Sequence, residues 1–490
     1  MLPSQLYRPS LALLTDFYQL TMAYAAWKEG VSGREACFVL SFRQNPFQGG
    51  FAVAAGLEHA VDYVLSHRFE QADLDYLGGQ VGRDGRPLFE PAFLGFLEHL
   101  RLRCDVDAVP EGTAVFPHEP LLRVRGPIIP CMLLETPLLN LVGFQTLVAT
   151  KAARVCLAAR ADPVIEFGLR RAQGIDGGLA ASRAAYIGGC AATSNVLAGR
   201  LYGIPVAGTH AHSWVMLFDD ELESFLAFAR AMPSNTVLLV DTYNSLEGVS
   251  KAIEVARALR AQGRELNGIR LDSGDLAWLS REARRMLDLA GFPEVAVLAS
   301  NELDEHIIQS LKDQGAAVGL WGVGTRLVTA HGDPALGGVY KLSAVRMRPG
   351  EAWRPRLKLS EQAAKISLPG IPQVRRYQGE ESFLADVIYD ETLGLPEAPE
   401  MVDPADMTRR RRIPAGTPGE DLLVPVVRAG EPAWRAPPLA AARERAKSQL
   451  ARLHSGLKRF VYPHQYPVGL ERSLFDLRTR LVLEARGVRE

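Results

Sequence analysis

The stretch that decides the fold is Pro205-Val-Ala-Gly-Thr-His-Ala-His-Ser-Trp214, near the middle of the chain. A short apolar run, 204–207, ends at Gly208-Thr209, and two histidines follow with one residue between them. An apolar run that stops at small residues and then carries polar side chains is typical of a buried strand in an α/β enzyme. The same pattern is therefore expected at other strand ends of the chain.

The sequence on both sides of this stretch alternates between strands and helices. Short apolar runs are separated by helical segments of about 10–18 residues, which implies parallel βαβ units. Six such units in succession predict an α/β fold with an irregular (β/α) barrel. The predicted strands are 164–168, 204–207, 236–241, 268–272, 295–300 and 318–321, with 338–343 as a candidate extension.

The first third of the chain lacks this alternation. A helix is predicted over 11–29, a strand over 35–43, a helix over 51–67 and two antiparallel strands within 111–126. We therefore expect residues 1–145 to form an N-terminal α+β domain and residues 146–345 to form the barrel, which is the catalytic domain. Residues 346–490 are a C-terminal region of loops and helices, of which the amphipathic helix 439–457 packs back on the body.

Composition excludes several classes of protein. The 490 residues carry a formal net charge of −1, so no basic field favours nucleic acid or an anionic membrane. The five cysteines form no CxxC pair, which argues against a disulfide framework or a cysteine-rich metal site. The chain shows no signal peptide or membrane-spanning run, so a cytoplasmic location is expected. The basic run Arg409–Arg412 lacks interleaved aromatic residues and is predicted to be a solvated loop.

Polar residues follow nearly every predicted strand. In a parallel barrel the carboxyl ends of all strands lie on one face, where the connecting loops build the active site. Carboxylates, arginines, a histidine and Gly/Thr/Ser turns suit a substrate with several anionic groups and at least one metal ion. These residues are Glu166, Arg170, Thr209, His212, Asp241, Arg270, Asp272, Ser300, Asn301 and Gly322-Val-Gly-Thr325.

Each of these signals also has a purely structural interpretation. The glycines of 322–325, with Ser300-Asn301, let backbone N–H groups approach a phosphate, but small residues also fit tight turns. Asp241 and Asp272 suit Mg²⁺ or ribose hydroxyls, and both precede helices that an aspartate can cap. Capping explains Asp275 better than Asp272, because Asp272 directly follows the apolar strand.

Arg270 and the two histidines allow alternatives as well. Arg270 lies between Ile269 and Leu271, so it faces the opposite side of the strand, where a substrate carboxylate or a structural salt bridge would be its partner. His210 and His212 alternate, but no third ligand of a zinc site is nearby. We interpret His210 as a packed or capping residue and His212 as an acid/base or phosphoryl acceptor.

In this order the residues resemble the nicotinate phosphoribosyltransferase family over nearly the whole chain. Any one of these motifs is weak, whereas seven in family order are specific. They are Thr15-Asp-Phe-Tyr-Gln-Leu-Thr-Met22, Glu166-Phe-Gly-Leu-Arg-Arg171, Gly208-Thr-His-Ala-His-Ser213, Val240-Asp-Thr-Tyr243, Ile269-Arg-Leu-Asp-Ser-Gly-Asp275, Ser300-Asn-Glu-Leu-Asp304 and Gly322-Val-Gly-Thr325.

The resemblance implies a type II phosphoribosyltransferase fold, in which C-terminal elements complete the N-terminal domain. It implies that nicotinate and 5-phosphoribosyl 1-diphosphate give nicotinate mononucleotide and diphosphate, with coupled ATP hydrolysis, in a homodimer with shared sites. His212 would be the phosphorylated residue, Arg270 would hold the nicotinate carboxylate near Thr209, and Phe167 and the partner subunit's Tyr18 would sandwich the ring. The remaining residues would bind the ribose, the diphosphate with Mg²⁺ and the 5-phosphate. They are Arg170, Asp241, Asp272, Ser300, Asn301, Gly324 and Thr325.

One segment departs from the resemblance, and two other functions stay open. Where the family often carries a basic residue, Lys365-Ile-Ser-Leu-Pro-Gly-Ile-Pro-Gln373 has Pro372, although Lys365 is present. The alternatives are a phosphoribosyltransferase for nicotinamide or quinolinate and a catalytically silent sensor of phosphoribosyl ligands. No carboxylate stands at 200–203 to recognise an amide, and a silent relative would not need His212.

Overall fold

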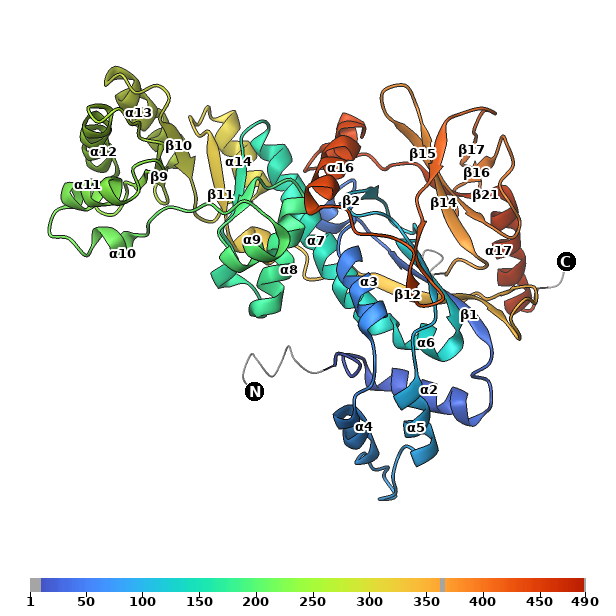
Figure 1. Ribbon diagram of the computed structural model, residues 1–490. Coiled ribbons are helices and arrows are strands. Elements are labelled where there is room, and N and C mark those ends of the chain that lie inside the picture. The colour runs from blue at the N-terminus through green and yellow to red at the C-terminus, as the bar shows by residue number, and fades with distance from the viewer. Residues whose placement is uncertain (1–9, 362–365, 489–490) are drawn as a thin grey trace. The chain divides into compact units, whose positions relative to one another are not determined.

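The computed structural model describes residues 10–361 and 366–488, so Lys365 lies outside the described residues. The chain divides into two compact units. The first unit takes the described parts of Met1–Thr146, Ala335–Pro438 and Ser448–Glu490, and the second takes Leu147–Pro334 and Leu439–Lys447. Each unit has its own sheet structure, and their elements are labelled in Figure 1.

The largest sheet of the first unit joins strands from both ends of the sequence. All its strand pairs are antiparallel. The order is β13 (Arg354–Pro355), β12 (Gly338–Arg346), β1 (Glu35–Phe42), β5 (Leu122–Pro127), β3 (Asp105–Ala108), β19 (Val424–Arg428) and β20 (Glu431–Pro432). The region 338–343 is therefore not an extension of the parallel sheet, and that expectation is wrong.

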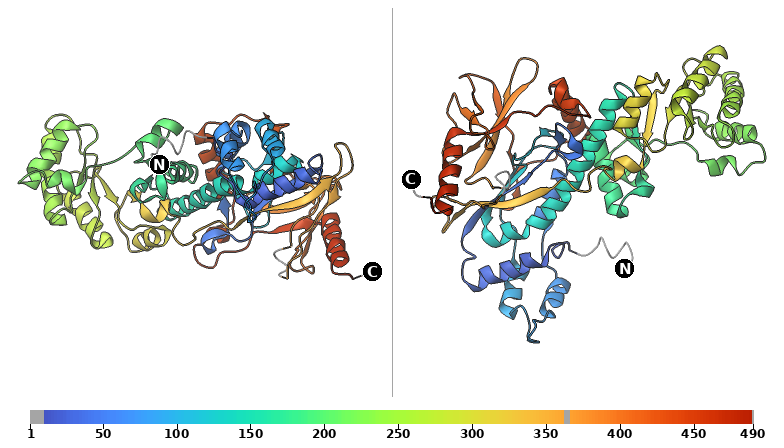
Figure 2. Two further views of the ribbon diagram at one scale, coloured as in Figure 1. Left: turned by 90° about the horizontal axis from the view of Figure 1, so that it is seen from below. Right: turned by 180° about the vertical axis from the view of Figure 1, so that it is seen from behind.

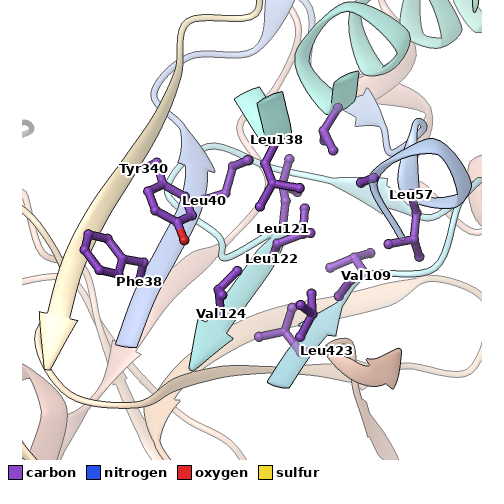
Figure 3. Packing of buried hydrophobic residues seen from close by; sticks show 14 of the residues in the cluster. Phe38, Leu40, Leu57, Val109, Leu121, Leu122, Val124, Leu138, Tyr340 and Leu423 are labelled. Carbon is purple, nitrogen blue, oxygen red and sulfur yellow. The ribbon is translucent and has the colours of Figure 1, made fainter. Parts of the chain in front are cut away.

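The core of the first unit covers one face of this sheet, as Figure 3 shows. Side chains from β1, β5 and β12 meet those of α3 (Leu57–Ser66) and α7 (Glu135–Ala159). The rings of Phe38 and Tyr340 stack with their centroids 4.9 Å apart, and the Tyr340 hydroxyl donates to the carbonyl of Cys131 at 2.8 Å. Burial of these aliphatic and aromatic groups is the main force that holds the strands together.

A second sheet of the first unit contains the ion pair of Arg376 and Asp386, whose side chains are both fully buried. Its order is β17 (Arg410–Arg412), β16 (Glu400–Val402), β21 (Val468–Glu471), β15 (Phe383–Asp390), β14 (Pro372–Gln378) and β18 (Gly419–Asp421). Helix α17 (Arg472–Ala485), red in Figures 1 and 2, lies against β15, β16 and β21. Arg410–Arg412 of the basic run form the edge strand β17, so the loop prediction is wrong there, while the run is exposed as expected. Charge on an edge discourages further pairing.

Two local predictions in the first unit are wrong. Residues 51–67 begin as the short strand β2 (Ala52–Val53), and α3 starts only at Leu57. The strands within 111–126 do not pair with each other, because β4 (Ala114–Val115) pairs with β2 while β5 pairs with β1 and β3. Strand partners depend on distant packing, which a local pattern does not contain.

Helices of the first unit form a separate apolar cluster. Side chains of α2 (Phe17–Lys28), α4 (Gln71–Gly78), α5 (Pro91–His99) and α6 (Ile128–Leu133) bury a group of phenylalanines and leucines. A helix is therefore found within 11–29, as predicted, but α2 starts only at Phe17, after Asp16 at its N-cap. The stretch Ile128–Ala159 is long and apolar enough for a membrane span by length and composition, but half of the window is buried within the protein. A core helix gives the same signal, so this is weak support for a membrane.

The second unit contains the predicted parallel sheet. Every strand pair is parallel, and the order is β7 (Ala192–Thr193), β6 (Val164–Glu166), β11 (Leu320–Val323), β10 (Ala296–Ala299), β9 (Gly268–Leu271) and β8 (Val237–Leu239). The mixed α/β class is therefore confirmed. The connecting helices include α8 (Gly174–Ile187), α9 (Val196–Tyr202), α10 (His212–Val215), α11 (Glu221–Ala231), α12 (Ser245–Arg260), α13 (Leu276–Leu289), α14 (Glu305–Asp313) and α15 (Thr325–Val328).

The predicted strand 204–207 is reduced to one bridge. Val206 pairs in parallel with Thr193 of β7, and Pro205 has no N–H with which to extend a ladder. Within 10–361 and 366–488, no backbone pairing joins this segment to β8, so β8 ends the sheet. Closure of the sheet into a barrel is not confirmed.

Candidate active site

Arg270 is the centre of a polar cluster at the strand ends of the second unit. It lies on β9 between the fully buried Ile269 and Leu271, as the alternation requires. Its guanidinium donates through Nε to Ser300 Oγ at 2.7 Å, through Nη1 to Thr209 Oγ1 at 3.1 Å and through Nη2 to Asp272 Oδ1 at 2.9 Å. The segments that follow β9, β10 and the bridge at Val206 are thus tied to one side chain.

The two aspartates have different surroundings. Asp272 accepts from Arg270 and from the Ser300 hydroxyl, so it does not cap the next helix, whereas Asp275 does by accepting from Trp278 N–H. Asp241 Oδ2 accepts from the backbone N–H of Asp272 at 2.9 Å and from the Ser273 hydroxyl at 2.6 Å. Asp241 Oδ1 is buried, and no residue within 10–361 or 366–488 donates a hydrogen bond to it. A buried carboxylate oxygen without a donor is suited to a cation or a ligand hydroxyl.

His212 lies beside this cluster, at the first position of α10. Its Nδ1 is 3.1 Å from Thr242 Oγ1, and its Nε2 is 3.9 Å from Asp272 Oδ2. The ring is about 41% exposed, so a ligand has access to it. An accessible imidazole fixed by a hydroxyl and facing a carboxylate is suited to accept a proton or a phosphoryl group.

His210 is buried and serves another purpose. Its Nε2 accepts from the backbone N–H of Leu239 at 3.1 Å, and its Nδ1 is 3.3 Å from the carbonyl oxygen of Ala211. Its ring packs against Phe228, with centroids 4.9 Å apart. Burial first, and then the charges of Arg270 and His212, lower the pKa of His210 to about 4, so the ring is neutral.

Phe167 borders the cluster. The Arg270 guanidinium carbon is 5.5 Å from the centroid of the Phe167 ring. The backbone of Gly322 passes so close that a Cβ there would lie 2.7 Å from this ring, and a Cβ at Gly324 would lie 3.3 Å from the Phe167 carbonyl oxygen. The glycines of 322–325 are therefore needed for close packing against Phe167, whether or not they also hold a phosphate.

The turn after β10 has an unusual backbone. Asn301 has φ = +112°, in a region that residues other than glycine rarely adopt. Such strain is common at functional sites. Across from this turn, Thr325 Oγ1 donates to Glu302 Oε1 at 3.4 Å, and Arg326 pairs with Asp304. Ser300 itself is buried, and its hydroxyl faces Arg270 and Asp272.

Within the described residues, three of the expected residues make no hydrogen bond to the network around Arg270. The carboxylate of Glu166 is buried, accepting from Thr193 Oγ1 at 2.6 Å, Ser182 Oγ at 2.9 Å and Gly168 N–H, so it braces the loop behind the site. Arg170 is exposed in the short helix Leu169–Arg171. Tyr18 is on α2 of the first unit and is about half exposed.

Sequence reasoning missed two hydroxyl residues. Thr242 contacts His212, and Ser273 contacts Asp241. Both stand immediately after a predicted site aspartate, and this adjacency was the available signal. Within the described ranges, no three histidine, cysteine, aspartate or glutamate side chains gather as a metal site.

A parallel sheet whose strand ends present an arginine, two aspartates, an accessible histidine and glycine turns defines an α/β enzyme for anionic substrates. The chain matches the nicotinate phosphoribosyltransferase N-terminal domain over residues 13–143 and the C-terminal domain of the same family over 373–478. It is 39% identical to a nicotinate phosphoribosyltransferase of Bacillus subtilis, with 98% of this chain and 96% of that one covered.

Two further comparisons agree. A nicotinate phosphoribosyltransferase of Mycobacterium tuberculosis is 40% identical, with 94% of this chain and 97% of the relative covered. The crystal structure of human nicotinic acid phosphoribosyltransferase superposes with a TM-score of 0.83 at 35% identity, covering 95% of this chain and 99% of the human one. The chain belongs to the nicotinate phosphoribosyltransferase family, and it is an enzyme.

Proposed function

We propose that the chain converts nicotinate, 5-phosphoribosyl 1-diphosphate, ATP and water to nicotinate mononucleotide, diphosphate, ADP and phosphate. This reaction salvages nicotinic acid for NAD synthesis. The observation that carries the proposal is Arg270, whose planar guanidinium is held at the strand ends with part of its surface open. A carboxylate is the ligand that such a group binds best.

The base pocket follows from this arginine. The nicotinate carboxylate would take its place against Arg270 and the Thr209 hydroxyl, with the pyridine ring against Phe167. An amide in place of the carboxylate would leave the guanidinium without its anion, which disfavours nicotinamide. Quinolinate, with a second carboxylate, would demand a second cation beside the ring.

The phosphoribosyl group would bind along the neighbouring strand ends. The pyridine nitrogen displaces diphosphate at the anomeric carbon through a transition state with oxocarbenium character, and Asp241 and Asp272 stabilise the positive sugar. Arg170 and Asn301, at the strained turn, are exposed to solvent. The residues that would bind the phosphoribosyl group and the diphosphate are Arg170, Asp241, Asp272, Ser300, Asn301, Gly324 and Thr325.

Mg²⁺ fits the oxygen-rich donors of this region. The buried Asp241 Oδ1, with Asp272, would hold it, while diphosphate and water would complete a shell of oxygens. When bound, the ion neutralises charge on the leaving diphosphate.

ATP would act through His212. Its accessible ring is suited to accept the γ-phosphoryl group, which would place negative charge and acceptor oxygens next to the substrate. That charge can order the loop 208–212 around the phosphoribosyl donor, and hydrolysis of the phosphohistidine would then release product.

We also propose a homodimer in the cytoplasm in which the partner subunit's Tyr18 completes the ring sandwich. The support is a set of exposed apolar side chains on and before α2, here called the apolar stripe, because contiguous exposed apolar side chains mark interaction sites. Sedimentation velocity at micromolar concentration tests it, and a purely monomeric protein contradicts it. The stripe consists of Leu11, Leu14, Phe17, Tyr18 and Met22.

Product analysis tests the reaction. Nicotinate, nicotinamide and quinolinate are offered separately with 5-phosphoribosyl 1-diphosphate and Mg²⁺, each with and without ATP. We expect nicotinate mononucleotide to form only when nicotinate is offered, with a rate that ATP increases, and no product from nicotinamide or quinolinate. His212→Ala should abolish the stimulation by ATP and keep some basal transfer, so undiminished coupling in that variant would remove His212 from its role.

A further inference from the structure

The loop that carries Thr209 and His212 is fixed to the rest of the second unit by different kinds of hydrogen bond on its two sides. Upstream it is tied to β7, because Thr193 N–H donates to the Pro205 carbonyl at 3.0 Å and Ala207 N–H donates to the Thr193 carbonyl at 3.1 Å. Beyond Ala207, in the described part of the chain, no backbone pair connects it with β8. The N–H of Leu239, on the free edge of β8, donates instead to the His210 imidazole.

The His210 side chain thus accepts the hydrogen bond from Leu239 that the backbone of a further strand beside β8 would accept. Only the neutral ring with its proton on Nδ1 fits both contacts, because Nδ1–H donates to the Ala211 carbonyl and Nε2 accepts from Leu239. The ring is 7% exposed and is enclosed by Phe225 and Phe228 of α11, so its orientation is fixed.

Two functional side chains depend on this anchor. The Thr209 hydroxyl donates to the His210 carbonyl at 3.0 Å, so its lone pairs face Arg270 Nη1 at 3.1 Å. On the other side, His212 reaches Thr242, which lies three residues after Leu239. A shift of the loop away from β8 would therefore displace both the base pocket and the phosphoryl acceptor.

We propose that His210 is a positioning residue, whose imidazole acceptor binds the loop 208–212 to β8 and so aligns Thr209 with Arg270 and His212 with Thr242. This positioning role rests on the proposed function, because one of its tests measures the binding of nicotinate. A histidine that merely fills space would need its ring against Phe228 but not an acceptor at the position of Nε2.

The test compares His210→Gln with His210→Asn. Glutamine places an amide oxygen where Nε2 lies and can accept from Leu239, whereas the amide of asparagine is one methylene too short. For asparagine we expect the KM for nicotinate to rise about tenfold and ATP stimulation to fall, with KM within about twofold of wild type for glutamine. Phe228→Leu, which loosens the packing but keeps the hydrogen bond, is the matched control and should lower Tm with little change in KM.

Hydrogen exchange of the Leu239 amide supplies a readout that needs no catalysis. The amide should exchange faster in His210→Asn than in wild type, His210→Gln or Phe228→Leu. Equal protection of Leu239 in the asparagine and glutamine variants, or equal KM values for them, overturns the proposal. If wild type fails to make nicotinate mononucleotide, the proposed reaction is wrong, while the exchange result still decides whether His210 anchors the loop.

Discussion

Arg376 in the first unit and Arg270 in the second are both arginines on a sheet, but they are held differently. Arg376 and its partner Asp386 are fully buried, and the guanidinium is enclosed by the rings of Phe383, Phe116 and Tyr466. Arg270 and Asp272 keep 15% and 27% of their side chains exposed. The closed pair can only support structure, whereas the open pair keeps a part of its surface to which a ligand can bind.

The largest expected effect falls on the closed pair. Arg376→Met should lower the free energy of unfolding by about 3–5 kcal/mol, because it leaves Asp386 buried without its cation. Equilibrium unfolding in urea measures this loss. The double variant Arg376→Met/Asp386→Leu should regain part of it, since no unpaired charge remains. A double variant less stable than the single one would contradict this account.

The open pair should show a smaller and different loss. Arg270→Lys should reduce kcat/KM for nicotinate about 100-fold, because an ammonium group cannot make the forked contacts to Ser300, Thr209 and a carboxylate. The free energy of unfolding should change by less than about 1 kcal/mol. Steady-state kinetics and urea unfolding together test the contrast, with the exposed Arg264→Lys as control. A stability loss as large as that of Arg376→Met would place Arg270 among the structural arginines.

The smallest effect concerns a carboxyl next to the closed pair. Burial, and then the charge of Asp386, raise the pKa of Glu119 well above its usual value. The folded state therefore binds this proton more tightly than the unfolded chain, and the stability that it contributes is lost as pH rises above the usual carboxyl range of about 4.5. Glutamine has no such proton to lose.

Glu119→Gln should consequently become more stable relative to wild type as pH rises from about 5 to about 8, by less than the loss expected for Arg376→Met. Its amide can still accept from Phe116 N–H, as Glu119 does at 2.9 Å. Urea unfolding across this range measures the difference, with Glu98→Gln on the exposed face of α5 as control. A constant difference between variant and wild type would show that Glu119 is ionised in the folded protein.

Much of the second unit could be predicted from the sequence, because its signals are local. The helices 221–231, 245–262, 275–290 and 304–314 are found as α11, α12, α13 and α14, within two residues at each end. The strand ends that bring Asp241, Arg270 and Ser300 together follow from the parallel order alone. Their joint position required no knowledge of distant contacts.

The rest depends on contacts that no local pattern shows. Glu166 ends a strand as a catalytic acid would, yet Thr193 and Ser182 hold it behind the site. The sequence predicts only a packed or capping role for His210. The structure shows that it also accepts a hydrogen bond from the N–H of Leu239 at the edge of β8. Strand β12 has the composition of the parallel strands that precede it in the sequence. Its partner β1, however, lies some 300 residues earlier.

The pairing of β1 with β12 also determines when the first unit can be completed during synthesis. Glu35 and Arg346 pair across 311 residues, so at about 5–20 residues per second the ribosome needs about 15 to 60 s to supply the second strand. During that time one edge of β1 has no partner, while the parallel sheet encoded in between emerges whole. The newly made enzyme therefore has a period in which a chaperone or another nascent chain can compete for that open edge.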